Sequence, residues 1–322
     1  WSALNDFEFI VGVAGSAANL VVSELHYNPR GTAADTSTDK DDYEFIELLN
    51  LSDSNTIELT GTRFTDGITF DFTGSNVVQL GPGERVLVVN NLDAFTERYP
   101  GVPATLIAGQ YTGNLDNSGE RVTLLDATDS VIKDFTYDDQ LPWPTEADGE
   151  GYSLVLNIES ANPDHNVAAN WRSHADVHGN PGGPDGITWD QWFASQGLGG
   201  DPGVDSDGDT IPDLFEYGAG TDPNDPSSGD PVSPHFASFY VNGQFQNFLA
   251  ITVRRNLEAG DILLYPEISK DLHSWSSSNS DLVMVEAVNQ GDGTELVTWR
   301  AAEPVDHIGQ EKCFLRLQIE SP

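Results

Sequence analysis

The sequence has little cysteine and little positive charge, and each shortage excludes a class of protein. The 322 residues include one cysteine, Cys313, so no disulfide can form within the chain. We expect Cys313 to be a small buried residue of a closing strand. Lysine and arginine number 14 against 52 aspartates and glutamates, which gives a net charge of −38. Because such a chain repels a polyanion, nucleic acid is excluded as its main ligand.

Long apolar runs are also missing. No stretch approaches the roughly 18 apolar residues of a membrane span, so we predict no span in this chain. The run at residues 9–14 is broken by Gly12 and lacks the basic flank of a signal peptide. We therefore expect any export signal to lie upstream of Trp1.

The sequence contains no familiar catalytic motif. G-x-S-x-G, H-E-x-x-H, the P-loop and the dinucleotide fingerprint are all absent, so we predict that the chain is not an enzyme. His165, His174 and His178 lie near Asp164 and Asp176, but their spacing fits no recognised metal site, and we expect a surface loop there. A carboxylate pair for glycoside hydrolysis stays open, since chance adjacency is expected among 52 acids.

Glycine and proline, 31 and 18 residues, punctuate the chain at short intervals. Between them lie short runs rich in valine, isoleucine, threonine and aromatic residues, which predict strands of an antiparallel sandwich. In the first half these runs are residues 20–25, 44–50, 67–72, 84–90, 120–126 and 130–137. In the last part they are residues 236–240, 248–254, 261–268, 282–288, 295–300 and 313–319.

Between two Pro- and Gly-rich linkers, residues 180–186 and 230–234, the hydrophobic period becomes helical. Apolar side chains recur there at i, i+3 and i+4 in two sets, Trp189, Trp192 and Phe193, and Ile211, Leu214 and Phe215. The predicted fold is therefore mainly β, with two β-sandwich domains joined by two short helices. We predict domains at 19–184, 185–230 and 231–322, preceded by a strand at 1–18.

The strongest chemical signal is the twelve-residue segment D-S-D-G-D-T-I-P-D-L-F-E, residues 205–216. Carboxylates occupy positions 1, 3, 5, 9 and 12, and position 7 can contribute a backbone carbonyl, which is the spacing of a calcium-binding loop. The predicted ligands are Asp205, Asp207, Asp209, Ile211, Asp213 and Glu216. Zinc or copper would need histidine or cysteine, which the segment lacks.

One position departs from the EF-hand loop. Position 6, normally glycine at a sharp turn, is Thr210, whereas Gly208 occupies position 4. We therefore expect a path similar to that of a dockerin or a thrombospondin type 3 repeat. Downstream, Asp222, Asn224 and Asp225 form a candidate for a second, weaker site, with a solvent-exposed acidic turn as the alternative.

Two further motifs resemble a known family. L-V-V-S-E-L-H-Y-N-P at residues 20–29 and D-Y-E-F-I-E-L-L-N at residues 42–50 resemble the start of a lamin tail domain. L-G-P-G-E at 80–84, N-S-G-E at 117–120 and N-W-R at 170–172 fit the same pattern, so the resemblance spans roughly 19–183. It implies an immunoglobulin-like β-sandwich without catalytic residues. In bacteria such domains occur in large secreted or surface proteins.

The later segments carry a weaker resemblance. Residues 189–226 resemble the calcium-loop module found near the ends of secreted bacterial proteins, and 231–322 is similar to the terminal sandwich that follows it. Together these features predict a calcium-stabilised, secreted or cell-surface structural or adhesion module that is not catalytic. Its expected partners are other extracellular proteins or copies of itself, since a lone strand at 1–12 could pair with a neighbour's sheet edge and build a filament.

The alternative is a carbohydrate-binding accessory region of a polysaccharide-degrading enzyme. Trp143, flanked by prolines, and Trp171, beside Arg172, are the candidates for stacking on sugar rings. Aromatic side chains that plug the ends of a sandwich would give the same pattern, so both interpretations stay open.

Overall fold

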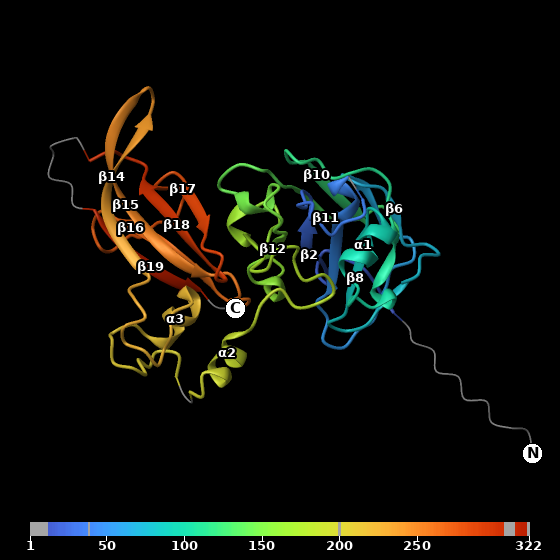
Figure 1. Cartoon of the computed structure of the whole chain (residues 1–322), viewed down its shortest axis with the longest axis horizontal. Helices are drawn as coiled ribbons and strands as arrows, with labels where there is room; N and C mark the ends of the chain where they lie inside the picture. The colour runs from blue at the N-terminus through green and yellow to red at the C-terminus, as the bar shows by residue number, and fades with distance from the viewer. Residues whose placement is uncertain (1–11, 38, 199–200, 306–312, 321–322) are drawn as a thin grey trace, which may run out of the picture. The chain divides into compact units, whose positions relative to one another are not determined.

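The structure is a computed structural model that describes residues 12–37, 39–198, 201–305 and 313–320 (Figure 1). Its contacts divide the chain into two compact units. Unit 1 is residues 1–137 with 181–183, and unit 2 is residues 138–180 with 184–322. Strands dominate both units, which confirms the predicted mainly β class with several sheets. The predicted strand at 1–12 falls almost wholly outside the described residues.

Unit 1 is built from short strands and one α-helix. Its strands are β1 (Val13–Ala14), β2 (Leu20–His26), β3 (Phe45–Asn50), β4 (Ile57–Glu58), β5 (Arg63–Asp66), β6 (Phe70–Asp71), β7 (Gln79–Leu80), β8 (Arg85–Val89), β9 (Ile107–Gln110), β10 (Arg121–Leu125) and β11 (Val131–Thr136). Its helices are α1 (Leu92–Arg98) and the 3₁₀ turns η1 (Lys40–Tyr43) and η2 (Ala104–Leu106).

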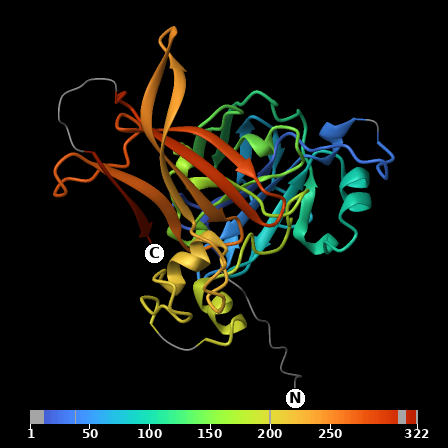
Figure 2. The ribbon, with the colours of Figure 1, turned by 60° about the vertical axis from the view of Figure 1, so that its left-hand side comes forward.

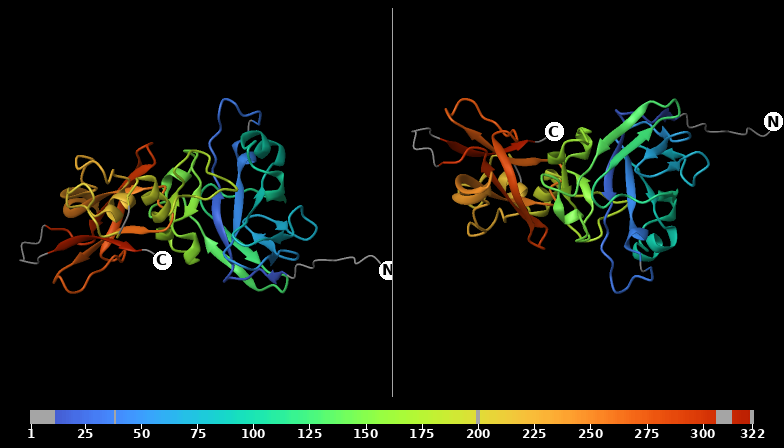
Figure 3. Two further views of the ribbon diagram at one scale, coloured as in Figure 1. Left: turned by 90° about the horizontal axis from the view of Figure 1, so that it is seen from below. Right: turned by 90° about the horizontal axis from the view of Figure 1, so that it is seen from above.

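The central strands of unit 1 are covered on both faces. Strands β2, β3, β8 and β9 lie side by side in that order, and β11, β10, β5 and β6 form a second sheet. Every residue of β2, β3 and β8 is buried, which explains why residues 45–49 are apolar at all positions but Glu47 instead of alternating with polar residues. Helix α1 lies on one face of these strands (Figure 3). Its Phe95 belongs to one apolar cluster with Phe45 and Leu87.

Unit 2 carries the two predicted helices and a longer-stranded sandwich. Its helices are α2 (Trp189–Ser195), α3 (Asp213–Ala219) and the 3₁₀ turns η3 (Thr145–Ala147), η4 (Glu159–Ala161) and η5 (Ala168–Asn170). Its strands are β12 (Leu154–Leu156), β13 (Trp171–Ser173), β14 (Val232–Val241), β15 (Gln244–Asn256), β16 (Leu263–Ser269), β17 (Leu282–Asn289), β18 (Thr294–Ala301) and β19 (Phe314–Glu320).

Strands β14, β15, β18 and β17 form one sheet of unit 2, and β16 pairs with β19. Figure 2 shows the long β14–β15 hairpin extending beyond the rest of its sheet. Val253, Leu264 and Val297 lie in the core of this sandwich. A neighbouring apolar cluster joins Trp192 of α2 and Tyr217 of α3 to residues of the sandwich, so the helices are packed onto it.

Most predicted strands and both helices of unit 2 are confirmed within a few residues. Helix α1 was not predicted, although Asn91 caps it by accepting the amides of Asp93 and Ala94. The expectation of a buried Cys313 is wrong, because β19 begins one residue later and leaves that side chain exposed. Among the described residues, no helix combines the length and apolarity needed to cross a bilayer.

Candidate metal centre

The acidic loop, residues 205–216, follows α2 and includes the first turn of α3 in unit 2, and the structure around both ends is fixed. Helix α2 begins with a capping box in which Thr188 and Gln191 satisfy each other's backbone amides. Helix α3 begins after Pro212 and ends at Gly220, which has a positive φ. From α3, the Tyr217 hydroxyl contacts the Ile187 carbonyl and an Asp261 carboxylate oxygen, each at 2.6 Å. The segment that follows the loop is therefore anchored to the rest of unit 2.

Asp205, at loop position 1, organises the turn. Its Oδ1 accepts the amides of Gly208 at 2.7 Å and Asp209 at 3.1 Å, and its Oδ2 accepts the amide of Thr210 at 2.9 Å. Asp209 in turn accepts the amide of Ile211 at 2.7 Å. These bonds wrap the backbone around the acidic side chains. As a result, one carboxylate oxygen each from Asp205, Asp207 and Asp209 lies within 4.8 Å of the others.

Two acids of α3 close the other side of the loop, and both are fully buried. Asp213 accepts the Ser206 amide at 2.9 Å and its hydroxyl at 2.7 Å. Glu216 accepts one bond, from the Thr221 hydroxyl at 3.2 Å, through Oε1. Within the described residues, Glu216 Oε2 and Asp207 Oδ2 are buried without a hydrogen-bond partner. Since buried polar atoms are nearly always satisfied, these two acceptors are an exception that a bound cation or proton would explain.

The electrostatics of the loop support that inference. Burial, and then the negative charges of Asp207, Asp209 and Asp213, raise the pKa of Glu216 to about 7. Burial and the neighbouring charges of Asp209 and Asp205 also raise the pKa of Asp207. Only a proton or a cation relieves such crowding of like charges. Because every potential ligand atom of the loop is an oxygen, the loop suits a hard cation such as Ca²⁺ rather than zinc or copper.

The departure at loop position 6 does not change the turn. Thr210 has φ +82°, so it adopts the left-handed conformation that glycine normally supplies at this position. Gly208 has φ +84° and takes up a second such position. The loop therefore makes its sharp turn with a residue that is strained there.

The other predicted metal residues lie in simpler surroundings. Asp222 accepts the Asn224 amide, and Asp225 accepts the amide and hydroxyl of Ser227. All three predicted residues of this segment, at 222, 224 and 225, are exposed. Their oxygens thus stabilise their own turns, and a second ion in this segment stays a prediction.

The histidines of the 165–178 segment have separate local contacts. His165 packs its ring against Trp171 with 5.4 Å between centroids. His174 is buried and accepts the Asp176 amide at 2.9 Å. Burial and then the charge of Arg172 lower the pKa of His174 to about 4, which keeps it neutral. Across the described ranges, the only group of three or more potential metal-binding side chains of His, Cys, Asp or Glu is the aspartate triplet of the loop.

The two candidate sugar-stacking tryptophans lie together but are largely covered. Trp143 is 7% exposed and Trp171 is 2% exposed, with 6.1 Å between their ring centroids. The Trp171 indole N–H donates to the His165 carbonyl at 3.0 Å. Both rings line a cavity of about 570 Å³ within unit 2. Their role in the core is evident, and a role in binding stays a prediction.

More accessible aromatic side chains lie on the β14–β15 hairpin, and they are not among the binding residues predicted from the sequence. Phe236, Tyr240 and Phe245 are 72%, 66% and 75% exposed. The rings of Tyr240 and Phe245 are paired across the strands at 5.1 Å. The signal was present, because residues 236, 238 and 240 alternate with inward-facing positions along one strand.

Together the fold and the centre define a mainly β protein with an acidic, all-oxygen loop suited to a hard cation. Residues 14–139 match the family model described as Lamin Tail Domain. That immunoglobulin-like fold indicates a non-catalytic structural module. No curated protein and no solved structure matches the chain.

The matched span runs from β1 to just beyond β11 and ends near the boundary of unit 1 at Tyr137. The predicted first domain, 19–184, was longer. Contacts group all of residues 138–180 with unit 2, and the predicted domain boundary at 184 stays a prediction.

Proposed function

We propose that the chain is a non-catalytic structural module in which a calcium ion, held by residues 205–216, locks α3 in place. One observation carries this proposal. The acidic loop leaves Glu216 Oε2 and Asp207 Oδ2 buried and unpartnered within the described residues. Calcium takes six to eight oxygen ligands, and Asp205, Asp209 and the Ile211 carbonyl complete a set to which water can add.

The ion would act through α3. Glu216 is followed by Tyr217, whose hydroxyl contacts Ile187 and Asp261 and whose ring packs on Trp192 at 5.3 Å. Without a cation, the carboxylates around Glu216 repel one another and favour opening of the loop. When a cation is bound, its attraction for the carboxylates holds the start of α3 in place. The contact between the Tyr217 and Trp192 rings is then kept as well. Two short helices have little core of their own, so the ion would supply much of the local stability.

The proposed setting is extracellular or at a bacterial cell surface. Calcium sites of extracellular modules bind with dissociation constants of about 10⁻⁴ to 10⁻³ M, which suits such an environment. A single cysteine leaves the chain without internal disulfides, so ions are the available cross-links. The proposed role is a scaffold or adhesion piece whose partners are other extracellular proteins or copies of itself, with a filament as one form of assembly.

The test is thermal unfolding of the full chain in calcium and in chelator. At ten times the dissociation constant, calcium should stabilise the wild type by about 1.4 kcal/mol, or roughly 3–6 °C. Glu216→Gln should abolish this calcium-dependent shift. Asp190→Asn is the matched control, since it removes the same charge from an exposed position on α2 and should leave the shift intact. Equal melting temperatures in calcium and chelator for the wild type would refute the proposal.

A second candidate function is polysaccharide binding as an accessory region. Two observations favour it, the cavity lined by Trp143 and Trp171 and the exposed aromatic side chains of the β14–β15 hairpin. A sugar ring can stack only on an aromatic face that is accessible, and Tyr240 and Phe245 provide such faces. A glycan array probed with the full chain tests this function. Binding to polysaccharides would support it, and a blank array would leave the structural module.

A further inference from the structure

We propose that unit 1 holds a second cation site, formed by Asp41, Glu44 and Asn117, which takes a hard divalent ion such as calcium. The three residues come from two loops that are far apart in the sequence. Asp41 lies in η1, Glu44 directly precedes β3, and Asn117 lies in the turn that precedes β10. This proposal is independent of the loop in unit 2 and of the function proposed above.

Glu44 is the central residue of this site, which we call the unit 1 oxygen cluster. Its side chain is 0% exposed. Glu44 Oε2 accepts the Tyr111 hydroxyl at 2.8 Å, the Leu115 amide at 3.0 Å and the Asn90 side-chain amide at 3.3 Å. In contrast, Glu44 Oε1 is buried and has no hydrogen-bond partner in the described part of the chain. One half of the carboxylate is therefore saturated while the other half lacks any donor.

The other two members repeat this pattern. Asp41 Oδ1 and Asn117 Oδ1 are also buried without a partner among the described residues. Asp41 accepts a side-chain hydrogen bond from Asn117, and its charge raises the pKa of Glu44, so the three groups are neighbours. The Leu115 amide that binds Glu44 lies two residues before Asn117. Three neighbouring side chains thus each have an acceptor oxygen without a hydrogen-bond partner among the described residues, although the Asn117 amide donates to Asp41.

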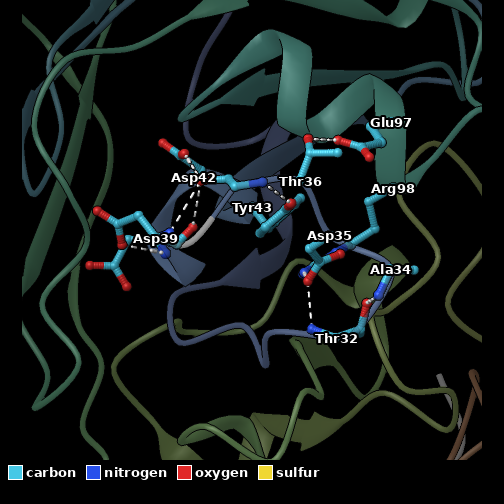
Figure 4. Close-up of polar contacts among 11 residues, drawn as sticks. Thr32, Ala34, Asp35, Thr36, Asp39, Asp42, Tyr43, Glu97 and Arg98 are labelled. Atoms are coloured by element: carbon cyan, nitrogen blue, oxygen red, sulfur yellow. Dashed lines mark hydrogen bonds and ion pairs between the residues drawn. The ribbon is translucent and has the colours of Figure 1, made fainter.

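The loop that carries Asp41 is held firmly. Arg98 of α1 pairs with Asp35 at 2.5 Å and lies over the Tyr43 ring at 3.4 Å. Figure 4 shows this arrangement, with Thr36 also bonded to Glu97 of α1. Because Tyr43, the last residue of η1, is held against α1, the fold restricts the position of Asp41 in the same turn. Such a preformed set of ligands lowers the entropic cost of binding an ion.

The local charges suit a cation. Asp39 and Asp42 flank Asp41 in the same turn, and both raise its pKa. The one nearby base, Lys40, lowers the pKa of Asp41, but its ammonium is bonded to the Asn28 side chain. Carboxylate and amide oxygens are the ligands of calcium, and the absence of nitrogen and sulfur donors from the set disfavours zinc. Water would complete the shell, which places this site among the weaker ones.

A shared proton is the competing explanation. Burial raises the pKa of Glu44 to about 8, so a protonated Glu44 could donate to Asp41 or Asn117 and satisfy the cluster without metal. The two explanations differ in their response to calcium. A cation site binds an ion and releases the proton, whereas a shared proton leaves calcium without effect.

The experiment measures calcium bound to the full chain by equilibrium dialysis at pH 8, in the Glu216→Gln background that removes the loop site. We expect a single ion to remain bound per chain. Asp41→Asn in this background should weaken its binding at least tenfold. Asp53→Asn is the matched control, because it removes the same charge from an exposed position of unit 1, and it should leave binding unchanged.

Asn117→Asp adds a carboxylate where Asp41→Asn removes one. Because a misfolded chain would not bind calcium more tightly, this variant separates loss of the site from misfolding. A third carboxylate should tighten calcium binding severalfold and lower the melting temperature in chelator. Absence of bound calcium in the Glu216→Gln background, or no response to either Asp41→Asn or Asn117→Asp, would overturn the unit 1 site. Neither result would affect the loop site, which is tested in the wild type by the calcium-dependent shift.

Discussion

The loop in unit 2 and the oxygen cluster in unit 1 have similar chemistry but are assembled in different ways. The loop collects its carboxylates from twelve consecutive residues, and Glu216 has one hydrogen bond, to Thr221. The cluster joins residues 41 and 117, and its Glu44 accepts three donors before any ion is considered. Similar unpartnered oxygens can therefore differ in how far the protein itself holds them. Protein donors position Glu44, whereas Glu216, under the function proposed above, would depend on an ion.

The largest expected difference concerns removal of each glutamate in chelator. Glu44→Ala should destabilise unit 1 by about 3 kcal/mol or more, because it leaves the Tyr111 hydroxyl, the Leu115 amide and the Asn90 amide without an acceptor. Glu216→Ala should cost less than about 1 kcal/mol under the same conditions, since it removes one bond and relieves repulsion. Urea denaturation of the full chain measures both. Equal losses would erase the distinction between the sites.

The contributions of Glu216 and Glu44 to stability should also depend on pH in different ranges. Burial and nearby acids raise the pKa of Glu216 to about 7, and burial raises that of Glu44 to about 8, from an ordinary value of 4.5. An acid with a raised pKa stabilises the folded state below its unfolded pKa and loses that contribution as pH rises through its folded pKa. In chelator, the melting temperature should therefore fall as pH rises from about 4.5, and the fall should end near pH 7 for the Glu216 contribution and near pH 8 for the Glu44 contribution.

Glu216→Gln should remove the part of this fall that ends near pH 7 and leave the part that continues to about pH 8. Buried His174, with its pKa lowered to about 4, contributes in the opposite direction, but only below about pH 6.5. Thermal scans above about pH 6.5 are thus free of the His174 contribution. An unchanged profile in Glu216→Gln would show that this carboxyl is not the group that titrates near neutrality.

The sequence predicts one of these sites and misses the other for a physical reason. A calcium loop is local, so its spacing is visible in residues 205–216, and the convergence of Asp205, Asp207 and Asp209 follows from backbone turns alone. The unit 1 cluster forms only when the chain folds and brings the turn at 117 beside η1. No local pattern encodes that approach.

The fold shows the same division. Strands with an alternating pattern, such as β14 and β15, and the helical spacing of α2 and α3 are confirmed. Helix α1 was missed because a seven-residue helix carries too few periodic positions, and its single buried aromatic residue, Phe95, is defined by packing. Exposure of Cys313 likewise depends on where β19 begins, and boundaries are the least predictable feature of an element.

The smallest expected effect tests whether the loop of unit 2 follows its observed backbone. Thr210 has φ +82°, a conformation that costs a non-glycine residue roughly 1–2 kcal/mol. Thr210→Gly should therefore raise the stability of the calcium-bound chain by up to about 1 kcal/mol, after the greater flexibility of glycine in the unfolded chain is deducted. Differential scanning calorimetry in saturating calcium measures the change.

Gly208→Ala is the matched opposite, because Gly208 has φ +84° and an added Cβ would meet nothing within 4 Å. Any loss of stability must then come from backbone strain rather than from a clash, and we expect about 1 kcal/mol. Both Gly208→Ala and Thr210→Gly keep the backbone amides that donate hydrogen bonds to Asp205, so these bonds do not account for a difference in stability between the variants. If both substitutions changed stability in the same direction, the left-handed turns at 208 and 210 would not be those of the ion-bound loop, and the ligand geometry assigned to Asp205, Asp207 and Asp209 would have to be redrawn.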